Sequence, residues 1–114
     1  MAELRVGALP EAALAAAAKF HAEILPEALR CLAGQANHVA LVFPPADHSH
    51  RAWRLAAIQS LAREYAPVRV NALVSDSQKA IAAALGYLEI AEGITGQLLE
   101  LDDRGAGEVL SSPP

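Results

Sequence analysis

Two histidines and a carboxylate stand close together in the segment Asp47-His48-Ser49-His50. Imidazole and carboxylate groups bind divalent metals, and a histidine can act as a general base near neutral pH. The segment follows an apolar run typical of a strand, and open parallel sheets bind their ligands at the carboxyl ends of strands. Asp47, His48 and His50, with Arg51 beside them, are therefore the candidates for a metal or catalytic site.

A plainer role for this segment is helix capping. Asp47 or Ser49 can cap the helix that follows while both histidines are solvated. His48 and His50 are also only two residues apart, a weak spacing for two ligands on one helix face. We favour capping, and we expect the chain to have no metal and no cofactor.

The remaining polar and aromatic side chains have structural interpretations. We expect His21 to be packed within a helix and His38 to be exposed before a strand. Trp53 is expected to be buried in a helix contact that leaves its indole one hydrogen bond. Four arginines could suggest an anion site: Arg51, Arg54, Arg63 and Arg69. Because they fall on different faces, we expect them to be solvated or paired.

Composition limits the classes of function. The chain has 114 residues, 54% of them hydrophobic and 19% charged, which predicts one core-rich domain rather than disorder. The net charge of -4 argues against nucleic acid and anionic membranes as partners, since binding phosphates needs clustered Lys and Arg. Cys31 is the sole cysteine, so an internal disulfide is impossible. With no signal-like start and no long apolar run, a cytoplasmic protein is expected.

Apolar periodicity predicts strands alternating with helices. The expected strands cover residues 4–9, 39–43, 68–74 and 97–101, and the expected helices cover residues 10–33, 50–65 and 75–88. Pro26 should kink or split the first helix, whose buried face is expected to include Leu14, His21 and Leu25. Ser75 and Gln78 resemble a capping box for the last helix. Residues 1–103 are expected to form one domain, followed by a flexible tail at 104–114.

This order predicts an α/β fold with a four-stranded, mostly parallel sheet and three main helices. Right-handed crossovers between neighbouring strands would place every helix on one face of the sheet. Yet residues 39–43 are apolar on both faces, as in a strand that is covered from both sides. The second face therefore needs a cover: another copy of the chain, a different partner, or an unusual course of the last helix.

Four segments resemble the C-terminal half of the short-chain dehydrogenases/reductases. They are LAREYAP at residues 61–67, RVNA at 69–72, GYL at 86–88 and ITGQLLELD at 94–102. The similarity is good over residues 40–102, whereas residues 4–34 match only as a strand and a long helix. It implies a truncated Rossmann-like layer fold.

The same resemblance implies that catalysis is lost. The family's catalytic tyrosine and lysine positions correspond to Asp47 and Arg51, and its serine falls near Pro44-Pro45. An Asp would need a pKa about three units above its usual value to donate a proton at neutral pH, and a nearby Arg opposes that shift. The glycine-rich turn that binds dinucleotides is also missing from these 114 residues.

We therefore expect a non-catalytic relative that works by association, as a homo-oligomer, in particular a homodimer, or as the partner of a full-length reductase. Members of the family commonly assemble through the helix equivalent to residues 50–65 and through the last strand. For the helix, this predicts an interface at Trp53, Ala57, Ser60 and Leu61. One alternative is a hydrolase or lyase that uses the Asp47-His50 loop. Another is a small-molecule binding module with a polar pocket at the strand carboxyl ends.

Overall fold

The core element of the structure is a four-stranded sheet in which every strand is parallel to its neighbours, in the order β1-β2-β3-β4. The strands are β1 (Ala2–Arg5), β2 (His38–Phe43), β3 (Arg69–Val74) and β4 (Leu98–Glu100). The computed structural model describes residues 1–102. The tail expected at 104–114, and the end of the domain at residue 103, lie outside the described residues. The predicted α/β class and parallel sheet are confirmed.

The first helical segment is interrupted just before Pro26. It consists of α1 (Ala13–Lys19), a π-helical segment (Phe20–Ile24) and α2 (Leu25–Leu32), with Pro26 in the first turn of α2. Pro26 has no N–H to donate to the preceding turn, and that turn is the π segment, whose hydrogen bonds span five residues instead of four. The predicted disruption at Pro26 therefore takes the form of a widened turn.

The π segment also changes which face of this helix is buried. Ala16 and Phe20 are fully buried, whereas Leu14 is 86% exposed and His21 is exposed. The expectation that Leu14 and His21 lie on the buried face was wrong, because it assumed a constant period of 3.6 residues. Beyond the π segment, Ala28 is buried on the α2 side that packs on the sheet.

Two further helices flank the sheet. Helix α3 (Arg51–Glu64) follows a single 3-10 turn (His48–His50), and α4 (Gln78–Ile90) connects β3 to β4. The N-cap of α4 is Ser77, whose hydroxyl accepts from the Ala80 N–H at 3.2 Å, so the cap lies two residues after the predicted Ser75. The Ser75 hydroxyl instead accepts from the Ser77 N–H, which shapes the turn before the helix.

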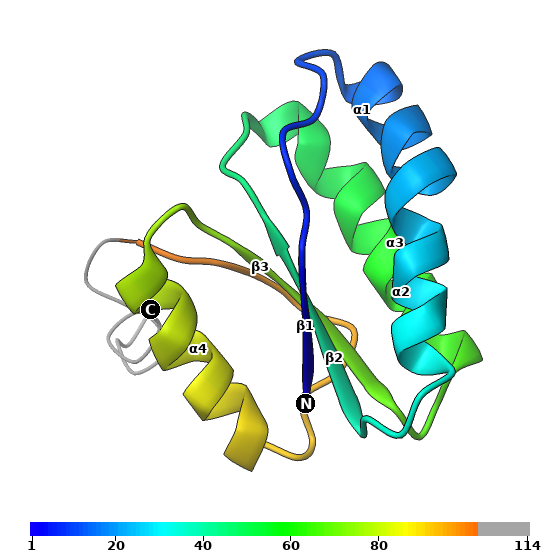
Figure 1. Cartoon of the computed structure of the whole chain (residues 1–114). Coiled ribbons are helices and arrows are strands. Elements are labelled where there is room, and N and C mark those ends of the chain that lie inside the picture. The colour runs from blue at the N-terminus through cyan, green and yellow to red at the C-terminus, as the bar shows by residue number, and fades with distance from the viewer. Residues whose placement is uncertain (103–114) are drawn as a thin grey trace.

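The helices are divided between the two faces of the sheet (Figure 1). One face is covered by α1, α2 and α3, and the other by α4. The residues of β2 alternate accordingly: Leu41 belongs to the larger core under α1 to α3, and Val42 packs with Leu73 and Leu88 under α4. All six residues of β2 are buried, as the two-sided apolar pattern predicted.

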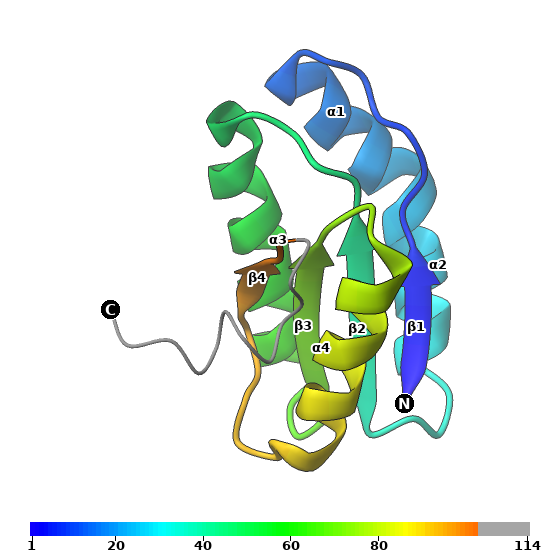
Figure 2. The same ribbon diagram turned by 90° about the vertical axis from the view of Figure 1, so that its left-hand side faces the viewer.

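The connection from β3 through α4 to β4 is left-handed. Figure 2 shows the strands side by side, with α4 in front of the sheet and α3 behind it. The sheet grows in one direction from β1 to β4, so the earlier crossovers are right-handed and a helix on the opposite face reverses the hand. The expectation that all helices share one face fails here. Of the three covers proposed for the second face, the unusual course of the last helix is the one observed.

Element boundaries differ from the prediction at several strand ends. Strand β1 covers Ala2–Arg5 rather than 4–9, and β4 covers Leu98–Glu100 rather than 97–101. Strand β2 begins at His38, one residue earlier than expected, because His38 pairs in register with Arg69 of β3. This places His38 inside the sheet, where it is fully buried rather than exposed.

Candidate functional site

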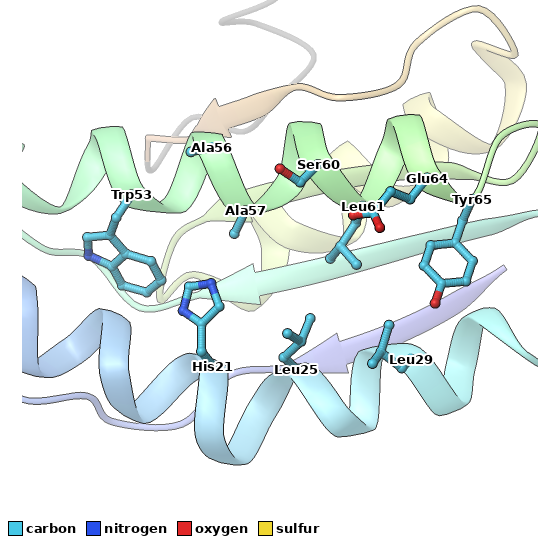
Figure 3. Close-up of a pocket in the computed structure, with 10 residues that line it drawn as sticks. All are labelled: His21, Leu25, Leu29, Trp53, Ala56, Ala57, Ser60, Leu61, Glu64 and Tyr65. Atoms are coloured by element: carbon cyan, nitrogen blue, oxygen red, sulfur yellow. The ribbon is translucent and has the colours of Figure 1, made fainter.

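An open groove runs between α3 and the helix formed by the π segment and α2 (Figure 3). Its volume is about 530 Å³. The residues that line it are His21, Leu25, Leu29, Trp53, Ala56, Ala57, Ser60, Leu61, Glu64 and Tyr65. Trp53 and His21 lie at one end, and Tyr65 and Leu29 at the other. The four side chains predicted to form an interface all line this groove.

Those four side chains differ in how much surface they offer. Ala57 and Leu61 are 9% and 4% exposed and belong to the core of their own chain, while Trp53 and Ser60 are half-buried. Ala56, which is not among the four predicted interface residues, lines the groove and is exposed. Of these five side chains, Ala56, Trp53 and Ser60 therefore provide the accessible surface in the groove.

Trp53 is held by an aromatic cluster at its end of the groove. Its ring centroid lies 5.4 Å from that of Phe20 and 6.0 Å from that of Phe43, within the range of favourable aromatic pairs. The indole N–H donates to Nδ1 of His50 at 3.3 Å. Trp53 is thus packed in a helix contact with its one hydrogen bond satisfied, as predicted.

His50 has both ring nitrogens engaged. Nε2 lies 2.8 Å from the carbonyl oxygen of Glu11, which can only accept, so Nε2 carries the proton. Nδ1 accepts from the Trp53 indole, which can only donate. The ring is 3% exposed, so the expectation that His50 is solvated was wrong. In this arrangement His50 has no lone pair free for a metal or a substrate proton.

Asp47 has the capping role that the sequence indicated. It is the N-cap of the 3-10 turn, and its Oδ1 accepts from the Ser49 N–H at 2.9 Å and from the Ser49 hydroxyl. These two hydrogen bonds lower the pKa of the exposed Asp47 carboxyl. His48 is exposed. Within residues 1–102, no three His, Cys, Asp or Glu side chains lie close enough together to share a metal ion.

Two of the arginines lie at the end of the sheet where the strands have their carboxyl termini. Arg51 forms an exposed ion pair with Glu100 of β4 at 3.3 Å. Arg54, one turn later, is 3% exposed and has its guanidinium 4.6 Å from the centroid of the Phe43 ring. Burial lowers the pKa of Arg54, and the charge of Glu100 opposes this effect. The expectation that Arg54 is solvated or paired was wrong, because the inner face of α3 carries it beneath the 44–47 loop.

Two cavities of about 350 and 310 Å³ flank Arg54. Both are bordered by Ala46, Asp47 and His50, and the smaller one also by Arg51 and His48. The structure thus brings together Asp47, His48, His50 and Arg51, the candidates for a metal or catalytic site, at the end of the sheet where open α/β proteins bind ligands.

A buried polar cluster at the opposite end of the sheet escaped the sequence analysis. Asn71 donates through Nδ2 to Nε2 of His38 at 3.0 Å, while its Oδ1 accepts from the Gln97 N–H at 3.0 Å. Nδ1 of His38 therefore carries the proton and has no partner within the described residues. Burial and the nearby charge of Arg69, with a smaller effect of the N-terminal amine, lower the pKa of His38 to about 4. The signal that could have found this cluster is a lone Asn inside an otherwise apolar strand.

These observations define a class of protein: a Rossmann-like α/β layer fold with helices on both faces and cavities at the carboxyl ends of its strands. A family model described as short chain dehydrogenase-like protein matches residues 4–101, so the chain belongs to that family. The family indicated by the sequence is confirmed. No curated protein and no solved structure matches the chain. None of the helices in residues 1–102 is both long and apolar enough to cross a bilayer.

Proposed function

We propose that this chain is a non-catalytic member of its family that works by self-association, and that the groove between α2 and α3 receives a second copy. The observation that carries the proposal is the groove itself. It is mostly apolar, it lies open along α3, and Leu29 at its rim is 36% exposed. An apolar hollow of this kind gives a partner side chain a place to be buried, which is why we place the interface here.

The lack of catalysis is supported by the residues in the positions that the resemblance assigns to chemistry. Asp47 takes the place of the tyrosine, and its pKa is lowered by Ser49, so it is ionised at neutral pH and has no proton to donate. Arg51 takes the place of the lysine and is paired with Glu100. Pro44 and Pro45, near the serine position, have no hydroxyl. None of these side chains supplies a general acid at neutral pH.

A second copy suits the groove because a twofold dimer uses the same patch on both subunits. The patch must therefore complement itself. His21 lies at one end of the groove and Glu64 towards the other (Figure 3), so an antiparallel pair would bring the imidazole of one copy near the carboxylate of the other. Ala52 and Ala56 on the exposed side of α3 are small, and small side chains let helix axes approach to about 8 Å.

The position of α4 limits which surfaces of the chain are free to bind a second copy. Because α4 packs over β2 and β3 on the second face of the sheet, the apolar residues of these strands on that face are already covered. Association would then depend on the outer surfaces of the helices. Leu14 of α1 and Tyr87 and Ile90 of α4 are exposed singly, whereas the groove along α3 is a hollow with a mostly apolar lining. A full-length reductase on the same groove would be the alternative occupant.

The test is the assembly state of the chain and of two matched variants, measured by sedimentation velocity over a wide range of protein concentration. Ala56→Arg places a long charged side chain at the groove and leaves the core intact. Ala83→Arg makes the same change at an exposed position on α4, on the opposite side of the sheet. We expect wild type and Ala83→Arg to dimerise and Ala56→Arg to be monomeric.

The choice of Ala56 rather than Trp53 keeps the experiment interpretable. Trp53 packs against Phe20 and Phe43, so a charged replacement could unfold the chain and abolish association for that reason alone. A wild-type chain that stays monomeric at every concentration, or an Ala56→Arg variant that dimerises as well as wild type, would contradict the proposal. Capture of a reductase by a monomeric chain would contradict self-association.

A further inference from the structure

Arg54 is a buried cation without a carboxylate partner in the described chain. Its side chain is 3% exposed, and its hydrogen bond within residues 1–102 runs from Nη1 to the carbonyl oxygen of Pro44 at 3.0 Å. Nε is buried and has no partner there. Taking a guanidinium out of water is costly unless its N–H groups are satisfied, so a buried arginine of this kind requires an explanation.

The unsatisfied part of the guanidinium has a specific shape. In arginine, the Nε–H and one N–H of Nη2 point in the same direction and form a side-on fork that matches the two oxygens of a carboxylate or phosphate. In Arg54 the carbonyl of Pro44 takes Nη1, which lies on the other side of the group. The side-on fork is therefore the part of Arg54 that has no partner among the described residues.

The acidic side chains around Arg54 are already engaged. Asp47 accepts from the backbone N–H and the hydroxyl of Ser49, and Glu100 is paired with Arg51. Both border the 310 Å³ cavity beside Arg54, yet neither is within hydrogen-bonding distance of its guanidinium. The Phe43 ring below the guanidinium supports the plane of the group and leaves its edge for hydrogen bonding.

We propose that Arg54 is the recognition residue of a binding site for a small oxyanion, a carboxylate or a phosphate group, at the carboxyl-end edge of the sheet. The anion would accept from Nε and Nη2 and occupy the space of the two cavities, of about 350 and 310 Å³, that flank the side chain. Because Nε is buried, binding requires a small movement of the atoms around it that admits one oxygen atom. The site is independent of the groove at which self-association is proposed.

The location suits a ligand site for a reason that does not depend on Arg54. In an open parallel sheet the carboxyl termini of all strands lie at one end of the sheet, and the loops that follow them leave a crevice there. The cavities beside Arg54 are formed by the segments that follow β1 and β2, together with Val74 at the end of β3 and residues of β4. Ligands of open α/β proteins commonly bind in this crevice, and here the Arg54 fork supplies hydrogen-bond donors beside it.

The experiment observes the Arg54 side chain directly. In a proton-nitrogen correlation spectrum of the labelled full chain, the Nε–H of each arginine gives a signal, assigned through Arg54→Met and Arg63→Met. Sodium acetate and inorganic phosphate are titrated separately, with sodium chloride at equal ionic strength as the control. We expect a saturable shift of the Arg54 signal with one or both oxyanions and no saturable shift of the exposed Arg63 signal.

Variants separate recognition from general charge effects. Arg54→Met keeps the aliphatic stem over Phe43 but removes the fork, and should weaken binding about tenfold or more, since hydrogen bonds to charged groups are worth that much. Arg63→Met, the same change at an exposed position of α3, should leave the affinity unchanged. Glu100→Gln removes a competing negative charge and should tighten binding. If Arg54→Met fails to fold, Arg54→Lys tests the fork while keeping the charge.

The outcomes are distinct. Saturation by acetate alone identifies a carboxylate ligand, saturation by phosphate alone a phosphorylated one, and saturation by both an oxyanion site without selectivity; each supports the proposal. It is overturned if neither probe produces a saturable shift, or if Arg63→Met weakens binding as much as Arg54→Met.

Discussion

Acid should destabilise this fold through His38, and the size of the effect follows from the structure. The pKa of His38 falls from 6.5 to about 4 on folding, chiefly because the ring is buried. Below about pH 6.5 the unfolded chain takes up a proton that the folded chain refuses, so stability falls as the pH is lowered towards 4. At about 1.4 kcal/mol for each pKa unit, the full loss attributable to His38 is about 3 kcal/mol.

This loss is large compared with the total stability of a small domain, which is typically about 5 to 15 kcal/mol. The variant that isolates it is His38→Gln, whose amide oxygen can still accept from Nδ2 of Asn71 but cannot take up a proton. Above about pH 7 the variant gains nothing from this change, because His38 is neutral in both states there. Between pH 6.5 and 4 it should lose about 3 kcal/mol less than wild type.

The assay is urea unfolding followed by the fluorescence of Trp53, the sole tryptophan, at several pH values between about 7.5 and 4. His48→Gln, at an exposed position, is the matched control and should keep the wild-type pH dependence. If wild type and His38→Gln lost stability in parallel, His38 would be taking up its proton in the folded state without cost. The argument from burial would then be refuted.

Two further predictions concern α4. Leu88→Ala should lower the free energy of unfolding by about 2 to 5 kcal/mol, because Leu88 is fully buried against β2 and β3. Leu14→Ala is the control: this residue is 86% exposed, so the free energy of unfolding should change by less than about 0.5 kcal/mol when both variants are unfolded in urea. Ser77→Ala removes the hydroxyl that accepts from the Ala80 N–H and should cost about 1 kcal/mol, with faster amide hydrogen exchange in the first turn of α4; unchanged exchange there would show that the cap contributes little.

The order of the strands and helices could be predicted because each depends on local residue patterns. The apolar run at 39–43, with Pro44 and Pro45 after it, indicated a strand covered on both faces, and β2 is fully buried. Pro26 indicated a disruption of the first helix. These signals are short-range consequences of side-chain period and of the missing proline N–H, so they are visible without knowledge of the tertiary structure.

What could not be predicted depends on contacts between distant segments. The exposures of His21 and His38 were predicted in reverse, because a π turn changed the phase of the helix and the pairing with β3 extended β2 by one residue. The burial of Arg54 depends on how the 44–47 loop folds over α3, and the periodicity of apolar residues does not indicate the course of a loop. Helix α4 covers the second face of the sheet because its crossover is left-handed. The prediction assumed a right-handed crossover, because nearly all such connections are right-handed.

The two outer strands of the described sheet, β1 and β4, differ in how readily another strand could pair with them. β4 is three residues long and offers little backbone to a foreign strand, which is a common protection against edge-to-edge aggregation. β1 has four residues, and its outward N–H and C=O groups have no neighbouring strand within residues 1–102. The ion pair between Glu3 and Arg5 lies along this strand, and charges on an edge disfavour the docking of another strand. A strand that added to the β1 edge would therefore have to pass Glu3 and Arg5, which act as gatekeepers there.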